Sequence, residues 1–301
     1  MSQSHSIFAG DALHTTPVVR KIGLADLKDA LKRGWDDFAA MPTHALFLCL
    51  IYPVVGLVLG RLAFGYEVLP LLYPLAAGFA LVGPFAALGL YELSRRREQG
   101  LDTSWQHAFD VIRAPSFGAI AALGVLLMMV FLIWIAVAQA LYVATFGYTP
   151  AASMPDFLRA VFSTPEGWML IVLGNGIGFL FALMVLIVSV VSFPLLLDRD
   201  AGAVEAVLTS VRAVAANPVM MALWGLIVAI ALALGSLPFF LGLAIVVPVL
   251  GHATWHLYRK VVEPAPAAQL EYPRPPRRPR YAAQFPAALF TGEDPPKPGS
   301  S

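Results

Sequence analysis

The chain has 301 residues, of which 58% are hydrophobic and only 13% are charged, and its mean hydropathy is +0.73. Soluble proteins have about half apolar and about a quarter charged residues, so this composition indicates a membrane protein. A net charge of +1 does not favour nucleic-acid binding, and a single cysteine excludes both an intramolecular disulfide and a cysteine-clustered metal site.

The N-terminal residues 1–23 are expected to be flexible, and the first 20 of them lack the apolar core of a cleaved signal peptide. An amphipathic helix is then predicted near 24–41, where it is expected to lie on the cytoplasmic membrane surface. Its apolar residues recur at helical spacing: Leu24, Leu27, Leu31, Trp35 and Phe38.

Uncharged stretches of about 18 or more residues are candidate spanning helices, because a helix satisfies its own backbone polar groups in lipid. Four spans are predicted at 45–60, 68–91, 117–144 and 167–197. A fifth uncharged block, 213–258, is about twice as long as one crossing needs, and we divide it at the glycine and proline of 235–238. The sequence therefore predicts six spans.

An internal repeat organises these spans. Amphipathic segments are also predicted near 101–114 and 203–216, and all three segments precede a proline and then a pair of spans. The alternative is that any cytoplasmic loop in contact with lipid becomes amphipathic. The predicted fold class is all-α: a polytopic membrane protein with six transmembrane helices in three hairpins, each preceded by a cytoplasmic amphipathic helix, over residues 24–262.

The basic residues orient the chain. Nearly all of them fall on the side of the membrane on which the N-terminus lies, and only Arg61 and Arg159 fall on the other side. The positive-inside rule then predicts a multi-pass protein of the bacterial inner membrane with both termini in the cytoplasm.

The C-terminal residues 263–301 are proline-rich and are expected to form a disordered cytoplasmic tail. Arg274, Arg277, Arg278 and Arg280 lie close enough to the last span to attract anionic headgroups. A polyproline ligand for a partner domain and a simple solvated tail are the alternatives.

Two amides stand inside predicted spans, where polar side chains are costly. Gln139 lies in the third span and Asn175 in the fourth, and both fall in the outer half, so a hydrogen bond between the two helices is expected. We interpret this pair as a packing contact in preference to a substrate site.

The most concentrated candidate site lies at the inner ends of the second and sixth spans. Its residues recur at helical spacing and comprise Glu92, Arg95, Arg96, His252, Trp255, His256, Tyr258 and Arg259. In one interpretation His252 and His256 chelate a metal with Glu92 as the third ligand. In another the histidines sense pH, and in the third Trp255, Tyr258 and Arg259 are ordinary interfacial anchors.

The stretches 83–98 and 251–259 together resemble a bacterial family of uncharacterised integral membrane proteins, DUF2189, over about Val18 to Val262. Some relatives carry the label of a cytochrome c oxidase subunit. A haem-copper catalytic subunit needs several histidines within its spans, and none of the six histidines of this chain lies there except at an inner end. The histidine positions therefore argue against a haem-copper catalytic subunit. The resemblance implies the membrane fold and brings no established activity.

The leading hypothesis is a protein without catalysis of its own that serves assembly, regulation or lipid organisation at the cytoplasmic face. The sequence contains neither a nucleophile paired with a base nor a phosphate-binding loop, and this weighs against an enzyme. A small-solute transporter or channel is the second hypothesis, and an accessory redox or lipid-headgroup enzyme subunit is the third. We expect no cofactor. The expected partners are membrane lipids with anionic headgroups, a membrane protein or a second copy, and no nucleic acid.

Overall fold

The computed structural model describes residues 17–41, 71–148, 153–237 and 241–264. The regular elements in these ranges are helices, accompanied by one isolated antiparallel bridge between Val19 and Val262. The predicted all-α class is therefore confirmed for the described part of the chain. The predicted first span at 45–60, the start of the second span, residues 1–16 and the tail from residue 265 lie outside it.

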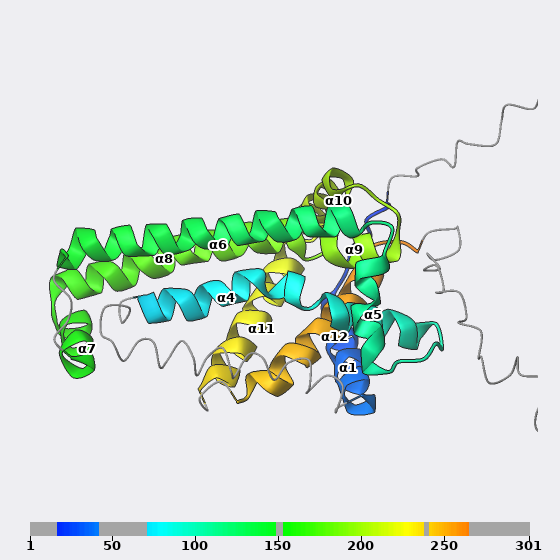
Figure 1. Ribbon diagram of the computed structural model, residues 1–301, viewed down its shortest axis with the longest axis horizontal. Coiled ribbons are helices and arrows are strands. Elements are labelled where there is room, and N and C mark those ends of the chain that lie inside the picture. Colours follow the sequence, from blue (N-terminus) through cyan, green and yellow to red (C-terminus); the bar gives the residue numbers. More distant parts are fainter. Residues whose placement is uncertain (1–16, 42–70, 149–152, 238–240, 265–301) are drawn as a thin grey trace, which may run out of the picture. The chain divides into compact units, whose positions relative to one another are not determined.

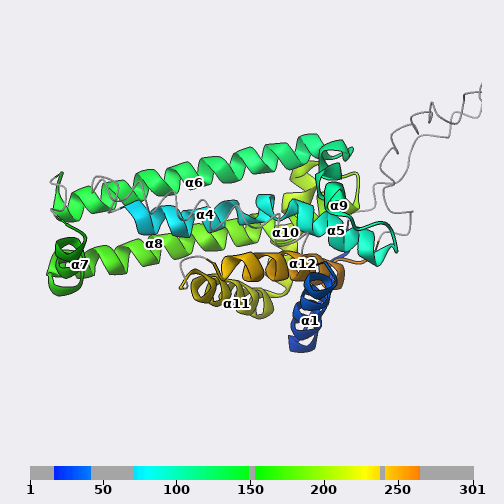
Figure 2. The same cartoon turned by 60° about the horizontal axis from the view of Figure 1, so that its bottom comes forward.

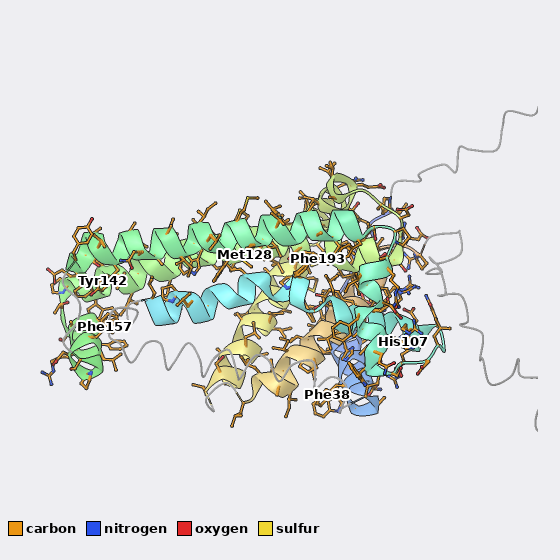
Figure 3. All side chains as sticks on the ribbon, viewed as in Figure 1. Phe38, His107, Met128, Tyr142, Phe157 and Phe193 are labelled. Atoms are coloured by element: carbon orange, nitrogen blue, oxygen red, sulfur yellow. The ribbon has the colours of Figure 1, made fainter. Side chains whose placement is uncertain are left out.

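Two long helices, α6 (Phe117–Phe146) and α8 (Pro165–Ser189), run side by side, and α4 (Leu72–Ala86) packs on α6 (Figures 1 and 2). Trp134 of α6 joins the three helices, since its indole N–H donates to the Pro74 carbonyl at 2.8 Å and its ring lies 5.6 Å from that of Phe181. At the far end α7 (Met154–Ser163) packs on α8, and its Phe157 ring lies 6.3 Å from the ring of Tyr142 on α6 (Figure 3).

Three helical segments of the described ranges are long and apolar enough to cross a membrane: Phe117–Phe146, Pro165–Asp198 and Pro218–Ser236. They coincide with the third, fourth and fifth predicted spans. The first half of the last uncharged block is α11 (Pro218–Ser236), which ends inside the predicted turn at 235–238, and α12 (Leu243–Val261) follows it. The full count of six spans in three hairpins stays a prediction.

Short helices extend α4 and α8 after a break. α5 (Leu88–Glu98) follows α4 at Ala87, and α9 (Ser192–Asp198) follows α8. Pro84 lies in the last turn of α4 and Pro194 in the first turn of α9. Proline has no backbone N–H and clashes with the preceding turn, so it favours an interruption at these places. The breaks bring the polar residues of α5 and α9 to the C-terminal half of α12.

Three further helices lie where the segments of 24–41, 101–114 and 203–216 were predicted. They are α1 (Leu24–Ala40), the 3₁₀ helix η2 (Trp105–Arg113) and α10 (Ala203–Ala216). Each is followed by one capping residue and then a proline, and the three capping residues, Met41, Ala114 and Asn217, are all buried. The three helices, which we call the collar, gather near α5, α9 and the C-terminal half of α12 (Figures 1 and 2), a region that we call the polar end.

Residues 17–23, which precede α1, form hydrogen bonds with the polar end, although a flexible N-terminus was predicted through residue 23. The backbone N–H of Arg20 donates to the Val261 carbonyl at 2.7 Å, and that of Ile22 donates to the Asn217 side-chain oxygen at 2.8 Å. The Asn217 amide also donates to the Arg20 carbonyl. Because these backbone groups pair with the end of α12 and with the cap of α10, the described residues before α1 do not form a free terminus.

Candidate functional site

The C-terminal half of α12 carries the polar motif that the sequence singled out. His252, Trp255 and Tyr258 are almost completely buried, and His256 is 8% exposed. Each motif residue contacts a polar side chain of another helix: His252 contacts Ser94, Trp255 contacts Glu98, His256 contacts Asp37, Tyr258 contacts Asp198, and Arg259 contacts Glu98 and Asp198. The motif therefore links α12 to α1, α5 and α9.

Asp37 of α1 is the centre of one cluster. Its carboxylate, which is 3% exposed as a residue, accepts from the Ser94 hydroxyl at 2.5 Å, lies 2.9 Å from Nε2 of His256, and accepts from the Arg97 guanidinium. It faces α12 because the buried side of α1 consists of Leu27, Ala30, Gly34 and Asp37 at spacings of three and four residues.

A close helix contact places Asp37 at this position. A side-chain carbon added at Gly34 would lie 2.6 Å from both the Cβ and the backbone nitrogen of Ala253. Only glycine leaves room for α12 at this distance, and the approach brings the carboxylate within hydrogen-bond reach of His256 one turn further along.

Asp37 is ionised at neutral pH. Burial raises the pKa of its carboxyl group, but hydrogen bonds from His256, Ser94 and Arg97, together with the electrostatic attraction of His256, hold the pKa below the ordinary value of 3.8. Ser94 has a single hydroxyl proton, which it donates to this carboxylate. Its oxygen then accepts from Nδ1 of His252 at 2.8 Å. Nε2 of His252 is buried and has no hydrogen-bond partner among the residues that the structure describes.

This order of groups differs from that of a catalytic serine triad. In a triad a histidine lies between the serine and the carboxylate and takes the serine proton. Here Ser94 lies between Asp37 and His252, and because its single proton bonds to Asp37, the facing histidine nitrogen must act as the donor. The arrangement orients His252 and supplies no base for a serine nucleophile.

A second cluster forms within α5. Both carboxylate oxygens of Glu92 accept from Arg95, at 2.8 and 3.0 Å, and both residues are buried. Arg96 lies 3.8 Å from Glu92 and 3.5 Å from Asp110 of η2. The structure thus divides the predicted site into three groups. Glu92, Arg95 and Arg96 lie together, and His252 and His256 contact Ser94 and Asp37. Trp255, Tyr258 and Arg259 form the third group with Glu98 and Asp198.

The metal interpretation with Glu92 as third ligand finds no support in this geometry. Arg95 occupies the two oxygens that such a ligand would use. Across the described ranges, no group of three or more histidine, cysteine, aspartate or glutamate side chains is arranged to hold a metal ion. His252 and His256 instead bond to protein groups through Nδ1 and Nε2, respectively.

The third cluster corrects the interpretation of Trp255, Tyr258 and Arg259 as interfacial anchors. The Tyr258 hydroxyl donates to Asp198 at 2.6 Å, and the Trp255 indole donates to Glu98 at 3.1 Å. Arg259 donates to Glu98 at 3.1 Å and reaches Asp198 at 3.4 Å. These side chains bond to the buried carboxylate of Asp198 and the exposed carboxylate of Glu98, both on other helices, so they link helices within the chain.

Asp37, Ser94 and Asp198 were not among the predicted site residues. Asp37 occupies the same helical face as Leu27 and Gly34, and this face was a signal that the sequence contained. Asp198 had no comparable signal, because it stands at the end of an apolar span and its partner is 60 residues away.

The two intramembrane amides do not pair as expected. The Asn175 side-chain oxygen accepts from the Tyr73 hydroxyl of α4 at 2.8 Å, and its nitrogen donates to the Ile171 carbonyl at 2.8 Å. Gln139 is exposed on α6. Because Gln139 lies on the exposed side of α6, the contact to Asn175 comes from Tyr73 of α4 instead.

Comparison with known proteins identifies a family over the middle of the chain. Residues 71–198 match a family described as predicted integral membrane protein (DUF2189). No similar curated protein and no similar solved structure was found. The match confirms the resemblance for α4 to α9, including the 83–98 motif, but it is narrower than the expected range and leaves the 251–259 motif outside.

Proposed function

For a chain with this integral membrane family match, we propose a role without catalysis: the collar organises lipid at the cytoplasmic face of the bacterial inner membrane. The proposal includes six spans in three hairpins and both termini in the cytoplasm. The polar end is then the cytoplasmic end, and the collar helices lie at the membrane surface.

One observation carries the proposal: the collar helices expose their large apolar residues. Trp35 is 53% exposed, Phe109 is 52% exposed and Leu208 is 51% exposed. Further exposed apolar residues lie on the same three helices: Leu24, Trp105, Ile112, Val204 and Val211. Small or polar residues predominate on the buried sides, among them Ala30, Gly34, Ala108, Ala206, Thr209 and Ala213.

This distribution suits a membrane surface. Each Å² of apolar surface left in water forgoes about 25 cal/mol of transfer free energy, so a protein rarely turns three apolar helix faces toward water. Lipid at the headgroup boundary removes this cost. The described basic residues support the orientation, since they lie on the collar, in the segment before α1, on α5 or near the ends of α9 and α12, except for Arg159 on α7.

The internal bonding of the polar end supports a role without catalysis. The carboxylates of Asp37, Glu92 and Asp198 each receive hydrogen bonds from neighbouring helices or from their own helix. Ser94, the buried hydroxyl beside a histidine, donates its proton to Asp37. These bonds hold the collar in place. The exposed apolar faces of the collar are then the part of the polar end that contacts lipid.

The depth of the collar in a bilayer tests the proposal. Replacing the only cysteine (Cys49→Ser) creates a background in which a spin label at Leu24→Cys, Phe109→Cys or Leu208→Cys reports its surroundings by electron paramagnetic resonance. We expect these three labels to collide with oxygen more than with a water-soluble nickel chelate, and a label at Asp36→Cys on the polar side of α1 to show the reverse. Equal water accessibility at Leu24→Cys and Asp36→Cys would overturn the proposal.

A lipid count tests the organising role itself. The purified chain and a Trp35→Ser/Phe109→Ser/Leu208→Ser variant are compared by native mass spectrometry for the number of lipids retained from the same membrane. We expect the variant to retain fewer lipids. An unchanged count with an unchanged fold would contradict the role.

A further inference from the structure

Carboxylates neutralise most basic side chains at the polar end. The ion pairs are Arg20 with Glu263, Arg33 with Asp29, Arg95 with Glu92, Arg97 with Asp37, Arg113 with Asp110, Arg259 with Glu98, and Lys260 with Asp29. These cations have their charge compensated within the chain. They are therefore poor candidates for binding an external anion.

Lys28 and Lys32 of α1 are different. Both are exposed and one helical turn apart, and neither has an ion-pair partner in the part of the chain that the structure describes. Lys21 and Arg212 are also unpaired there, but they lie outside α1, and Arg212 donates to a backbone carbonyl of its own helix. Lys28 and Lys32 thus form the one uncompensated pair of cations on a single described helix.

Exposed apolar residues lie beside this pair. At 100° per residue, Leu24 and Trp35 project within about 60° of Lys28 on the helical wheel of α1. The Trp35 ring packs against that of Phe38 at 5.7 Å, which limits its motion. Ammonium groups next to an aromatic and an aliphatic side chain match the boundary of a bilayer, where phosphates lie above the first methylene groups.

The opposite side of α1 fixes this orientation. Gly34 packs on Ala253, and Asp37 bonds to His256 and Ser94. If α1 could rotate about its axis, its two lysines would have no fixed position relative to the membrane surface. Here the clamp on α12 holds the lysine side outward.

We propose that Lys28 and Lys32 bind the phosphodiester of an anionic membrane lipid, with Trp35 and Leu24 in contact with the acyl chains below it. This proposal rests on the surface position of the collar proposed above. Charge complementarity assigns the lipid class: two uncompensated ammonium groups favour a phospholipid of net negative charge over a zwitterionic one.

The test measures lipid preference by native mass spectrometry. The full chain is purified in detergent and titrated with phosphatidylglycerol or with phosphatidylcholine of the same acyl chains. We expect tighter binding of phosphatidylglycerol to the natural chain, and an approximately tenfold loss of this preference in Lys28→Gln/Lys32→Gln. Lys28→Arg/Lys32→Arg should keep the preference, because it keeps both charges.

Two further variants sharpen the result. Arg159→Gln removes an exposed cation from α7 and should leave the preference unchanged. Asp36→Asn removes the carboxylate one turn beyond Lys32 and should increase the preference for phosphatidylglycerol. An equal preference in the natural chain and in Lys28→Gln/Lys32→Gln would overturn the headgroup site.

The spin label at Leu24→Cys separates this failure from that of the proposed function. A label that stays in lipid while the preference is unchanged in Lys28→Gln/Lys32→Gln refutes the headgroup site alone. A label that lies in water refutes the surface position of the collar and the headgroup site with it.

Discussion

The C-terminal ends of α5 and α12 have a similar sequence pattern, but their charged side chains are neutralised differently. Residues 91–96 read Tyr-Glu-Leu-Ser-Arg-Arg and residues 255–260 read Trp-His-Leu-Tyr-Arg-Lys. Each stretch begins seven residues after a proline, Pro84 or Pro248. In α5 the glutamate and the first arginine pair with each other, whereas α12 has a histidine in place of that glutamate.

This single difference changes what each helix requires. Glu92 and Arg95 form a bidentate pair three residues apart. In α12, His256 contacts Asp37, and Arg259 contacts Glu98 and Asp198 of other helices. A helix end with a local carboxylate can neutralise itself, and one without it needs partners. In α5 the buried pair of Glu92 and Arg95 is thus neutralised within the helix, although Arg97 pairs with Asp37 of α1, whereas the equivalent residues of α12 depend on other helices.

The largest effect is expected from breaking the pair within α5. Arg95→Met leaves the buried Glu92 carboxylate without its bidentate partner, and we expect the free energy of unfolding to fall by about 4 kcal/mol. Unfolding in mixed micelles of increasing denaturing-detergent content measures this change. Glu92→Gln/Arg95→Met should recover most of the loss.

The equivalent change in α12 is the control. Arg259 is partly exposed, and Asp198 and Glu98 keep the Tyr258 and Trp255 hydrogen bonds when it is lost. We expect Arg259→Met to cost about 1 kcal/mol. An equal cost for Arg95→Met and Arg259→Met would refute the distinction between the two helix ends.

The next effect concerns the partner that α12 requires. Asp37→Asn removes the charge that His256, Ser94 and Arg97 share, and we expect a loss of about 3 kcal/mol. The neighbouring Asp36→Asn, on an exposed position of the same helix, should change stability by less than about 0.5 kcal/mol. Thermal unfolding of both variants in the same detergent gives the comparison.

The pH dependence of stability should distinguish Asp37 from Asn at this position. Burial raises the pKa of Asp37, but hydrogen bonds from His256, Ser94 and Arg97 and the electrostatic attraction of His256 together lower it below 3.8. The contribution of Asp37 to stability is therefore present above the ordinary pKa of 3.8 and is lost as the pH falls through the lower folded-state value. The advantage of the natural chain over Asp37→Asn should therefore persist near neutral pH and shrink below about pH 4. Loss of this advantage already at about pH 6 would contradict this assignment.

A smaller effect is expected where α1 approaches α12. Gly34→Ala places a carbon 2.6 Å from Ala253, and the helices must separate to relieve the overlap, at about 2 kcal/mol. Gly118→Ala in α6 meets no atom within 4 Å and should stabilise the chain by about 0.5 kcal/mol. Thermal unfolding measures both, and an equal sign for the two changes would contradict the role of Gly34.

The smallest effect is expected from Tyr258→Phe. It removes the hydroxyl that donates to Asp198 at 2.6 Å but leaves the Arg259 contact with the same oxygen, so a loss of about 1 kcal/mol is expected. Chemical unfolding of Tyr258→Phe beside the natural chain measures it. A loss as large as that of Asp37→Asn would mean that α9 holds α12 as firmly as α1 does.

The sequence predicted features that depend on neighbours along the chain. The all-α class, three apolar spans and the positions of the collar helices follow from hydropathy, helical periodicity and proline. The proximity of Glu92 to Arg95 also follows from their three-residue spacing. The Asp37 cluster could not be predicted in this way, because His256 lies 219 residues away and Ser94 lies 57 residues away.

The sequence by itself determined that this chain has a small set of charges, that it is built from apolar helices, and that polar residues concentrate at the ends of α5 and α12. Only the tertiary structure decided which of these groups are bonded to one another. Helix packing determines these bonds, because Gly34 allows α1 to approach α12 closely and Asp37 on the same face then reaches His256. The same packing turns Trp35, Lys28 and Lys32 outward, because a helix clamped on one face must present the other.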